Sequence, residues 1–143
     1  MKNLSREEID SVLVRVGYGF LGLASENRPY VVPMSFGYDG DNCYFQMNSQ
    51  GRKFDYIEDE APASLTVLTI DHETGVSKSI LVEGRIYEVS ADKSESAWQA
   101  LALNAQFGTD LSLWGMSLQE SDISLYVLRP ENVSGRVFGE QHV

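Results

Sequence analysis

The sequence predicts a mainly β protein in a single domain (residues 1–143), with peripheral helices and about six antiparallel strands in a closed or partly open barrel. Three observations lead to this fold class. Short apolar runs of strand length recur along the chain and are separated by turn sequences such as Asp39-Gly40-Asp41. Few stretches show the apolar spacing of a helix, the longest at residues 5–16 and 92–107. One long strand contains Gly84, where a bulge or sharp bend fits a barrel corner.

Length and composition fit one folded domain with a strongly acidic surface. The chain has 143 residues, of which 43% are hydrophobic and 22% are charged, so the composition supplies a core and argues against disorder. The formal net charge is −10 at pH 7. Such a field repels the phosphates of nucleic acids and anionic membrane surfaces, so we expect neither as a partner.

The cysteine content and the N-terminal sequence point to a cytoplasmic protein. The single cysteine, Cys43, cannot form an internal disulfide and stands in an apolar run without a basic neighbour, which favours a buried hydrophobe over a catalytic thiol. The first ten residues are polar and lack the apolar core of a signal peptide. We also find no apolar run long enough to span a bilayer.

The first third of the chain predicts one helix and three strands. Ser5-Arg6-Glu7-Glu8 has the form of a capping box, and apolar residues follow at helical spacing, so a helix is expected at residues 5–16 and should end at Gly17. A polar turn at residues 26–28 and the turn at residues 39–41 separate the strands that follow. These strands are predicted at residues 18–24, 30–38 and 42–47.

The remainder predicts two further helices and four strands. A short helix at residues 52–58 should end at Ala61-Pro62, and a longer helix is expected from Asp92 to about Phe107, with Trp98 among its apolar positions. Residues 108–121 look irregular. The strands are predicted at residues 63–70, 77–89, 123–128 and 133–138, with a turn at residues 129–132 between the last two.

The most distinctive polar segment runs from Ser49 to Lys53, between a predicted strand and a predicted helix. A helix start offers free backbone N–H groups and the positive end of the helix dipole. Gly51 allows close backbone approach, and Arg52 can hold two phosphate oxygens at once while Lys53 adds a second charge. The segment therefore fits a phosphomonoester, although on this pattern alone a solvated pair of surface cations is the alternative.

The strand around Pro33 is unusual because a proline interrupts an apolar run. Since proline cannot donate to a strand ladder, this point is expected to be a sheet edge, a bulge, or a place where a ligand replaces the partner strand. A flat ring could lie against such a strand and use its exposed main-chain groups.

The sequence contains no recognisable motif for hydrolysis, metal binding or nucleotide binding. The two histidines, His72 and His142, have no metal-ligand spacing, and we predict no metal site. The Gly-x-Ser-x-Gly elbow, the Walker loop and the complete Gly-x-Gly-x-x-Gly motif are all missing from the sequence. No catalytic side chain can therefore be assigned from the sequence.

Several motifs in order resemble the flavin-binding split-barrel family, the pyridoxamine 5'-phosphate oxidase-like group, with the nitroimidazole-reductase-like branch closest. The resemblance covers roughly residues 5–136. The motifs are Arg28-Pro29-Tyr30-Val31-Val32-Pro33, Phe36-Gly37-Tyr38, Tyr44-Phe45, Gly51-Arg52-Lys53, Ala63 to Val67, Ser79 to Val89 with Glu83-Gly84-Arg85, and Pro130 to Arg136.

The resemblance implies a six-stranded antiparallel split β-barrel that pairs into a homodimer with two FMN sites at the interface. Its implied ring contacts are Pro33, Met34, Ser35 and Phe36. Asn48, Ser49, Arg52 and Lys53 would hold the ribityl chain and phosphate. Ser79, Ile80 and Leu81 would flank the flavin, and Trp114 and Arg136 would reach the partner's site.

Two departures from the family pattern limit what the resemblance implies. Members of the branch often carry a histidine just after the Tyr-Phe pair, where this chain has Gln46, so chemistry that needs an imidazole there is not expected. The chain also lacks the C-terminal signature of true pyridoxamine phosphate oxidases, which argues against a role in vitamin B6 synthesis.

Four functional hypotheses follow. The first is an FMN-dependent oxidoreductase that takes hydride at flavin N5 from a small-molecule donor and reduces a nitro compound, a quinone or oxygen. The second is a flavin-binding carrier or redox sensor without turnover. The third is a split barrel that binds heme or a deazaflavin, and the fourth, an oligonucleotide-binding barrel, conflicts with the acidic charge.

Overall fold

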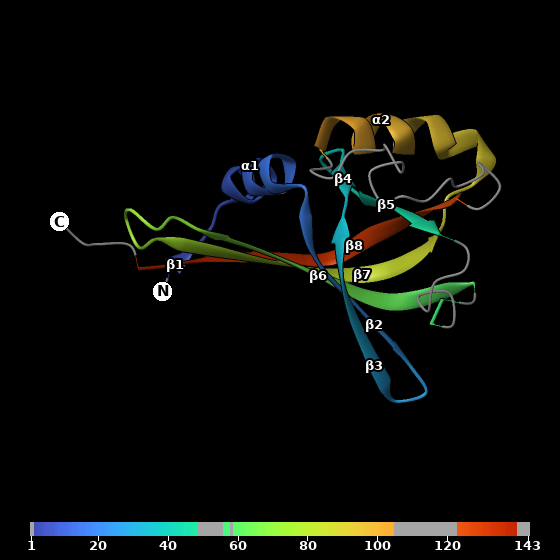
Figure 1. The fold of residues 1–143 in the computed structure, drawn as a ribbon, viewed down its shortest axis with the longest axis horizontal. Helices are drawn as coiled ribbons and strands as arrows, with labels where there is room; N and C mark the ends of the chain where they lie inside the picture. Colours follow the sequence, from blue (N-terminus) through green and yellow to red (C-terminus); the bar gives the residue numbers. More distant parts are fainter. Residues whose placement is uncertain (1, 49–55, 58, 105–122, 140–143) are drawn as a thin grey trace, which may run out of the picture.

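In a computed structural model, the chain forms a curled antiparallel sheet with helices on its outside (Figure 1). The predicted fold class is confirmed, but the sheet has eight strands where six were predicted. The structure describes residues 2–48, 56–57, 59–104 and 123–139. The strands are β1 (Lys2–Asn3), β2 (Tyr18–Ser25), β3 (Arg28–Ser35), β4 (Gly37–Tyr38), β5 (Cys43–Asn48), β6 (Glu60–Ile70), β7 (Ser77–Glu88) and β8 (Ile123–Phe138). The helices are α1 (Arg6–Val16), the 3-10 helix η2 (Ala91–Lys93) and α2 (Ser94–Asn104). None of these helices is long and apolar enough to cross a membrane.

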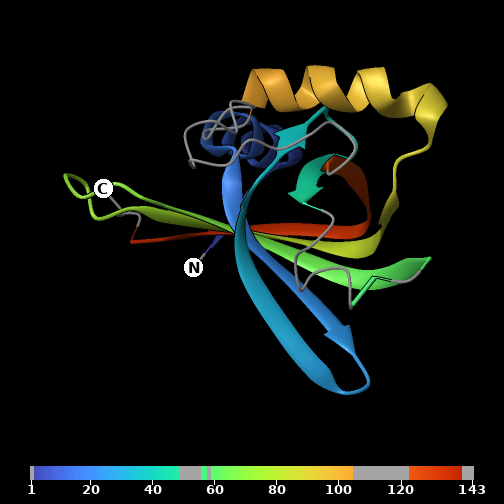
Figure 2. The ribbon, with the colours of Figure 1, turned by 45° about the vertical axis from the view of Figure 1, so that its right-hand side comes forward.

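The sheet closes on itself at one point and stays open elsewhere. Its strand order is β3-β2-β6-β7-β8-β5-β4, with β1 added beside β8. Only Phe36 separates β3 from β4 in the chain, so the two ends of this order meet there. Away from Phe36, β3 and the β2–β3 hairpin turn outward and leave β5 behind (Figure 2). The result is a split barrel, closed at Phe36 and open between β3 and β5.

The barrel interior is filled by apolar side chains from most strands and from α1. Leu13, Leu21, Phe36, Phe45 and Leu65 are completely buried in this main core. Helix α1 begins as the capping box predicts, since the Ser5 hydroxyl accepts from the Glu8 amide at 3.2 Å and a Glu8 carboxylate oxygen accepts from the Ser5 amide at 3.0 Å. Gly17 ends the helix at a φ of 70°. The local signals thus place α1 so that its apolar face closes the barrel interior.

Helix α2 covers β4 and β5 from the other side and forms a second apolar cluster. Tyr44, Leu125 and Val127 from the sheet pack there against Ala97, Ala100 and Leu101 from the helix. Gly37 of β4 lies so close to α2 that a Cβ there would be 2.3 Å from the Ala100 carbonyl carbon. The buried Asn104 side chain donates to the Tyr38 carbonyl. Helix α2 is therefore fixed to β4, next to the point of barrel closure.

The C-terminal strand differs from the prediction. Residues 123–128 and 133–138 were expected to be two strands around a turn, but β8 runs unbroken from Ile123 to Phe138. The pairing of β7 with β8 continues through Pro130, with a register shift between Glu83 and Gly84. A Cβ on Gly84 would lie 2.0 Å from the Arg129 carbonyl oxygen. Gly84 thus marks the predicted irregularity, and β8 absorbs it without turning.

Three other predicted element boundaries differ from those in the structure. The strand predicted at residues 30–38 is interrupted at Phe36, where the chain exchanges its β2 partner for β5. Strand β6 begins at Glu60, so Ala61-Pro62 belongs to a strand and does not end a helix there. The second helix is described from Ser94 to Asn104, after a short 3-10 turn at residues 91–93. The helix predicted at residues 52–58 falls largely outside the described residues.

Candidate functional site

The opening between β3 and β5 is the most distinctive feature that the fold creates. Strand β5 pairs with β8 along its whole length, but β4 covers its other edge only at Cys43 and Tyr44. Within the described residues, the edge of β5 from Phe45 to Asn48 and the edge of β3 both lack a partner strand. The opening is therefore a gap between two strands of one sheet, each with unpaired main-chain groups.

The free edge of β3 is shaped by its prolines. The Phe36 amide donates to the Gly17 carbonyl at 2.9 Å, so the alternate positions 35, 33, 31 and 29 turn their main-chain groups away from β2. Pro29 and Pro33 both occupy such positions, where a missing N–H costs the β2–β3 ladder nothing. The expectation that Pro33 lies at a sheet edge is confirmed. This edge keeps its carbonyl acceptors, but between Pro29 and Pro33 only Val31 offers a donor.

The predicted ring contacts divide between the two faces of β3. Pro33 is exposed and Ser35 is half-buried on the outer face. Met34 is half-buried against the main core, and Phe36 is completely buried with its ring 6.3 Å from that of Phe45. The predicted contiguous stretch is thus not one surface. Phe36 is a core residue at the apex of the opening, and its side chain is not available to a ligand.

Strands β7 and β8 bring further predicted residues to the outer face of β3. Pro33, Phe20, Thr66, Leu81 and Ser134 are successive partners across five strands, so their side chains share a face. Ser79 and its partner Arg136 lie on the same face, since each is two residues from a member of that row. Ile80, by contrast, is completely buried in the main core and points away from this face.

The predicted phosphate-binding residues are not placed. Asn48 is the last residue of β5 and pairs with Ile123, so its main chain borders the opening. Ser49, Arg52, Lys53 and Trp114 lie outside the described residues. The segment 49–55 is bounded by Asn48 and by Tyr56, whose ring stacks on Tyr30 of β3 with centroids 5.1 Å apart. This stacking was not predicted, because the two tyrosines are far apart in sequence and no local pattern relates them.

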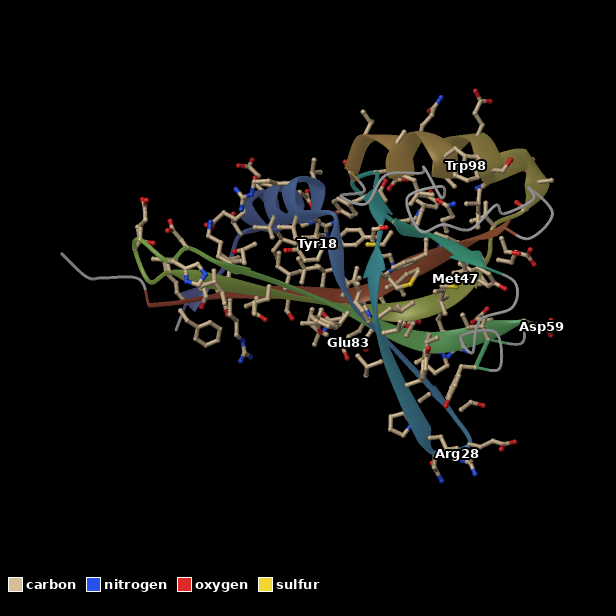
Figure 3. The ribbon with its side chains drawn as sticks, in the orientation of Figure 1. Tyr18, Arg28, Met47, Asp59, Glu83 and Trp98 are labelled. Atoms are coloured by element: carbon tan, nitrogen blue, oxygen red, sulfur yellow. The ribbon has the colours of Figure 1, made fainter. Side chains whose placement is uncertain are left out.

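Gln46 is the polar residue whose environment the sequence did not reveal. Its side-chain nitrogen is buried and has no hydrogen-bond partner. Strand β5 presents Cys43, Phe45 and Met47 to the main core, and Met47 is labelled at β5 in Figure 3. Gln46 points to the opposite side, so alternation along β5 could have located it but could not have shown that its amide lacks a partner.

Cys43 behaves as the composition predicts. It is completely buried in the main core, and burial, helped by the nearby Asp39 carboxylate, raises the pKa of its thiol to about 12. The thiol therefore stays protonated near neutral pH and is not a nucleophile. Within the described residues, no three His, Cys, Asp or Glu side chains lie together as they would to hold a metal ion.

The outer face also carries an apolar surface that the sequence analysis did not identify. Six of the nine large hydrophobic side chains that are exposed in the described residues lie on this sheet face. We call them the outer apolar face: Tyr18, Phe20, Val31, Leu68, Ile70 and Phe138. Phe20 is 53% exposed and Leu68 is 49% exposed. The sequence did contain a signal for this surface. Residues 63–70 include apolar side chains at both odd and even positions, so both faces of the strand carry them, as in a strand buried on both sides.

Comparison with known proteins agrees with this architecture. A family model described as pyridoxamine 5'-phosphate oxidase matches residues 5–137. A FAD-binding protein from Mesorhizobium loti is similar with a TM-score of 0.75 and 24% identity, over 96% of this chain and 97% of that one. A FAD and heme binding protein from Mycobacterium smegmatis has a TM-score of 0.72 and 17% identity, over 95% of this chain and 73% of that one.

Two further proteins are also similar to this chain. A protein of Bacteroides thetaiotaomicron that has been proposed to act in 5-nitroimidazole antibiotic resistance has a TM-score of 0.64 and 19% identity, over 95% of this chain and 87% of that one. An uncharacterized protein of Rhizobium meliloti is 29% identical over 89 residues, which are 62% of this chain. The match spans 57% of that relative's length.

Proposed function

Because this chain belongs to the pyridoxamine 5'-phosphate oxidase family, we propose that it binds FMN in the opening between β3 and β5. The observation that carries the proposal is the pair of unpaired strand edges. A flat heterocycle with carbonyl and N–H groups can satisfy main-chain groups that would otherwise lack a partner strand. The buried and unpartnered amide of Gln46 on β5 also fits a polar ligand beside this gap.

Different residues of the chain would contact the ring, the ribityl chain and the phosphate of the ligand. The main chain of β3 from Val31 to Ser35 would face the ring, with Met34 on its inner side. Asn48, Ser49, Arg52 and Lys53 would hold the ribityl chain and the phosphate, as the family resemblance implies. Ser79, Leu81 and Arg136 would border the site from the outer face, and Trp114 from the partner's side. When bound, the flavin supplies two-electron redox chemistry, so no acid–base pair is required of the protein for hydride uptake.

We propose that the bound flavin makes the protein an oxidoreductase. Reduced nicotinamide or another small donor would deliver the electrons, and a nitro compound, a quinone or oxygen would accept them. Because no strand that the structure describes pairs with the open side of β3, a second small molecule can approach the ring from there. The buried, protonated Cys43 takes no part.

A second candidate is a cofactor-binding protein without turnover, for FAD, heme or a deazaflavin. It is favoured by the names of the similar structures, which include a FAD-binding protein and a FAD and heme binding protein. The same opening would bind any of these cofactors, because its unpaired strand edges can face any planar ring. This candidate differs from the first in its spectrum and in the absence of steady-state reduction.

We expect the freshly purified protein to be yellow, with flavin absorption bands, and to release FMN on denaturation. Addition of reduced nicotinamide should bleach the bands, and a nitro compound or a quinone should restore them. A Soret band, or released FAD, would favour the second candidate. A colourless protein that takes up no flavin during titration would contradict both.

We further propose that the chain forms a homodimer through the outer apolar face, which would place a partner beside the flavin. Exposed apolar surface of this kind marks an interaction site, and two-fold dimers are the most common assemblies. The face draws its residues from β2, β3, β6 and β8, and it includes Phe20 and Leu68 on the neighbouring strands β2 and β6.

Charges on the outer apolar face should separate the subunits. We expect Phe20→Glu combined with Leu68→Glu to convert a dimer into a monomer of 16.0 kDa in sedimentation analysis, because two buried carboxylates per subunit oppose association. Leu103→Glu is the matched control, since Leu103 is 84% exposed on α2 and lies off this face. A wild-type chain that sediments as a monomer would disprove the dimer.

A further inference from the structure

Helix α1 contacts both sides of the opening near its apex. Gly17, which ends the helix, accepts a hydrogen bond from the Phe36 amide at 2.9 Å, where β3 ends. The first turns of the same helix reach the other side, because Arg6 and Asp10 contact Tyr38 of β4 and the turn that follows it. An α-helix of 11 residues is a stiff rod about 16 Å long. One rigid element therefore connects the β3 side of the opening to the β4–β5 side.

The contact on the β4–β5 side is a hydrogen-bond network around the Tyr38 hydroxyl. This hydroxyl donates to an Asp10 carboxylate oxygen at 2.6 Å and accepts from a terminal nitrogen of Arg6 at 3.1 Å. The same Arg6 nitrogen donates to the Gly40 carbonyl at 3.1 Å, and Arg6 Nε donates to Asp10 at 3.0 Å. A hydroxyl bond of 2.6 Å to a carboxylate is short and charge-assisted. Because the Tyr38 ring is buried in the main core, the hydroxyl is held in one place.

Strand pairing supports the β5 side of the opening from one direction only. Strand β4 has two residues, which pair with Tyr44 and Cys43, and beyond them β5 continues along β8. Within the described residues, the other edge of β5 has no partner strand. Besides β8, the elements that fix the β4–β5 hairpin are therefore the two helices, α2 by packing at Gly37 and α1 by hydrogen bonds at Tyr38.

We infer that Tyr38 is a positioning residue for the flavin: its hydroxyl attaches the β4–β5 hairpin to α1, and α1 in turn sets the distance of the free edge of β5 from β3. This inference rests on the proposed function and deepens it. Tyr38 acts without contacting the ligand, because its ring lies in the main core and its hydroxyl faces α1. What the attachment sets is the width of the opening, and with it the fit of a planar ring between the two strand edges.

The first test compares Tyr38→Phe with Tyr44→Phe in the full-length protein. Each change removes one hydroxyl that donates to a carboxylate and keeps the aromatic ring. The Tyr44 hydroxyl donates to Asp39 at 2.9 Å, so its bond stays within the hairpin, whereas the bonds of Tyr38 reach α1. We expect Tyr38→Phe to raise the Kd for FMN about tenfold. We expect Tyr44→Phe to change it by less than about twofold, because that bond does not connect the hairpin to α1.

Riboflavin and a second control separate positioning from phosphate binding and from general loss of stability. The width of the opening acts on the ring, which FMN and riboflavin share, so Tyr38→Phe should raise both Kd values by the same factor. Val12→Ala removes buried volume from α1 outside the network, since Val12 is only 1% exposed. It should lower the melting temperature and leave both Kd values, measured well below that temperature, within about twofold of wild type. If Val12→Ala weakened binding as much as Tyr38→Phe does, Tyr38 would be merely structural and the inference would be wrong.

Amide hydrogen exchange tests the attachment without any flavin. In the flavin-free protein, we expect amides of β4 and β5 to exchange several-fold faster in Tyr38→Phe than in Tyr44→Phe, because local opening follows the loss of local support. Equal exchange in the two variants would overturn the inference, and so would equal Kd values for FMN. If wild type takes up no flavin, the proposed function fails, and the exchange rates still decide whether Tyr38 attaches the hairpin to α1.

Discussion

Replacing Gly37 by alanine should destabilise the protein by about 3 kcal/mol, because the added methyl group has no room. An ideal Cβ at this position lies 2.3 Å from both the Ala100 carbonyl carbon and the Leu101 amide nitrogen. These are backbone atoms in the middle of a helix, so they cannot move aside as the end of a flexible side chain does. Helix α2 must shift as a whole or β4 must move away from it.

The consequences reach the proposed binding site. Movement of α2 would loosen the second apolar cluster and the bond from Asn104 to the Tyr38 carbonyl. It would also disturb Phe36, the residue at which β3 and β4 close the barrel and from which the opening begins. We therefore expect Gly37→Ala to lower both the free energy of unfolding and the affinity for flavin.

Urea unfolding of Gly37→Ala beside Gly22→Ala measures this effect. Gly22 is also in a strand, but a Cβ there would meet only the Ser64 carbonyl oxygen at an ordinary 3.6 Å. We expect Gly22→Ala to change the free energy of unfolding by less than about 1 kcal/mol. Equal stabilities for the two variants would show that α2 does not pack against Gly37 as described.

The parts of the fold that could be predicted are those that local signals determine. Helix α1 follows from the Ser5–Glu8 capping box, the helical spacing of Ile9, Val12 and Leu13, and Gly17 at its end. These signals act within one or two turns of the helix, so a single sequence contains them. The irregularity at Gly84 and the edge position of Pro33 were predictable for the same reason, since glycine allows close backbone approach and proline cannot donate to a strand ladder.

The parts that could not be predicted depend on distant partners. Nothing near Phe36 indicates that the chain changes its partner from β2 to β5 there. The helix that packs on Gly37 at this point, α2, comes some sixty residues later in the sequence. Likewise, Pro130 looks like a turn residue, but β8 continues through it, because β8 accommodates one extra residue, Glu131, as a bulge opposite Glu83 and Gly84 of β7. The family resemblance assigned Pro33, Met34, Ser35 and Phe36 together to the flavin ring. The pleat of the strand turns the side chains of Pro33 and Ser35 to one face and those of Met34 and Phe36 to the other, which the resemblance did not specify.

Removal of the two cations after β5 should have the largest effect on binding. We expect Arg52→Ala together with Lys53→Ala to raise the Kd for FMN by roughly two to four orders of magnitude, since each charge-assisted bond to phosphate contributes about 1.5–3 kcal/mol. The described residues on either side of positions 49–55 are Asn48, the last residue of β5, and Tyr56, whose ring stacks on Tyr30 of β3. Both of these flanking residues adjoin the strands that border the opening.

The phosphate itself provides the sharpest control. Riboflavin has the ring and the ribityl chain of FMN without the phosphate, so the double variant should bind riboflavin as wild type does. Lys93→Ala with Arg129→Ala removes the same charge from exposed positions on η2 and β8 and should leave the Kd for FMN within about twofold, because screened surface charges contribute little. If the Arg52 and Lys53 variant bound both flavins less tightly by the same factor, the cations would act on the ring or on the fold, and the phosphate-binding role would be wrong. A selective loss of FMN affinity would instead locate the phosphate beside the end of β5 and would fix the direction in which the ring extends along β3.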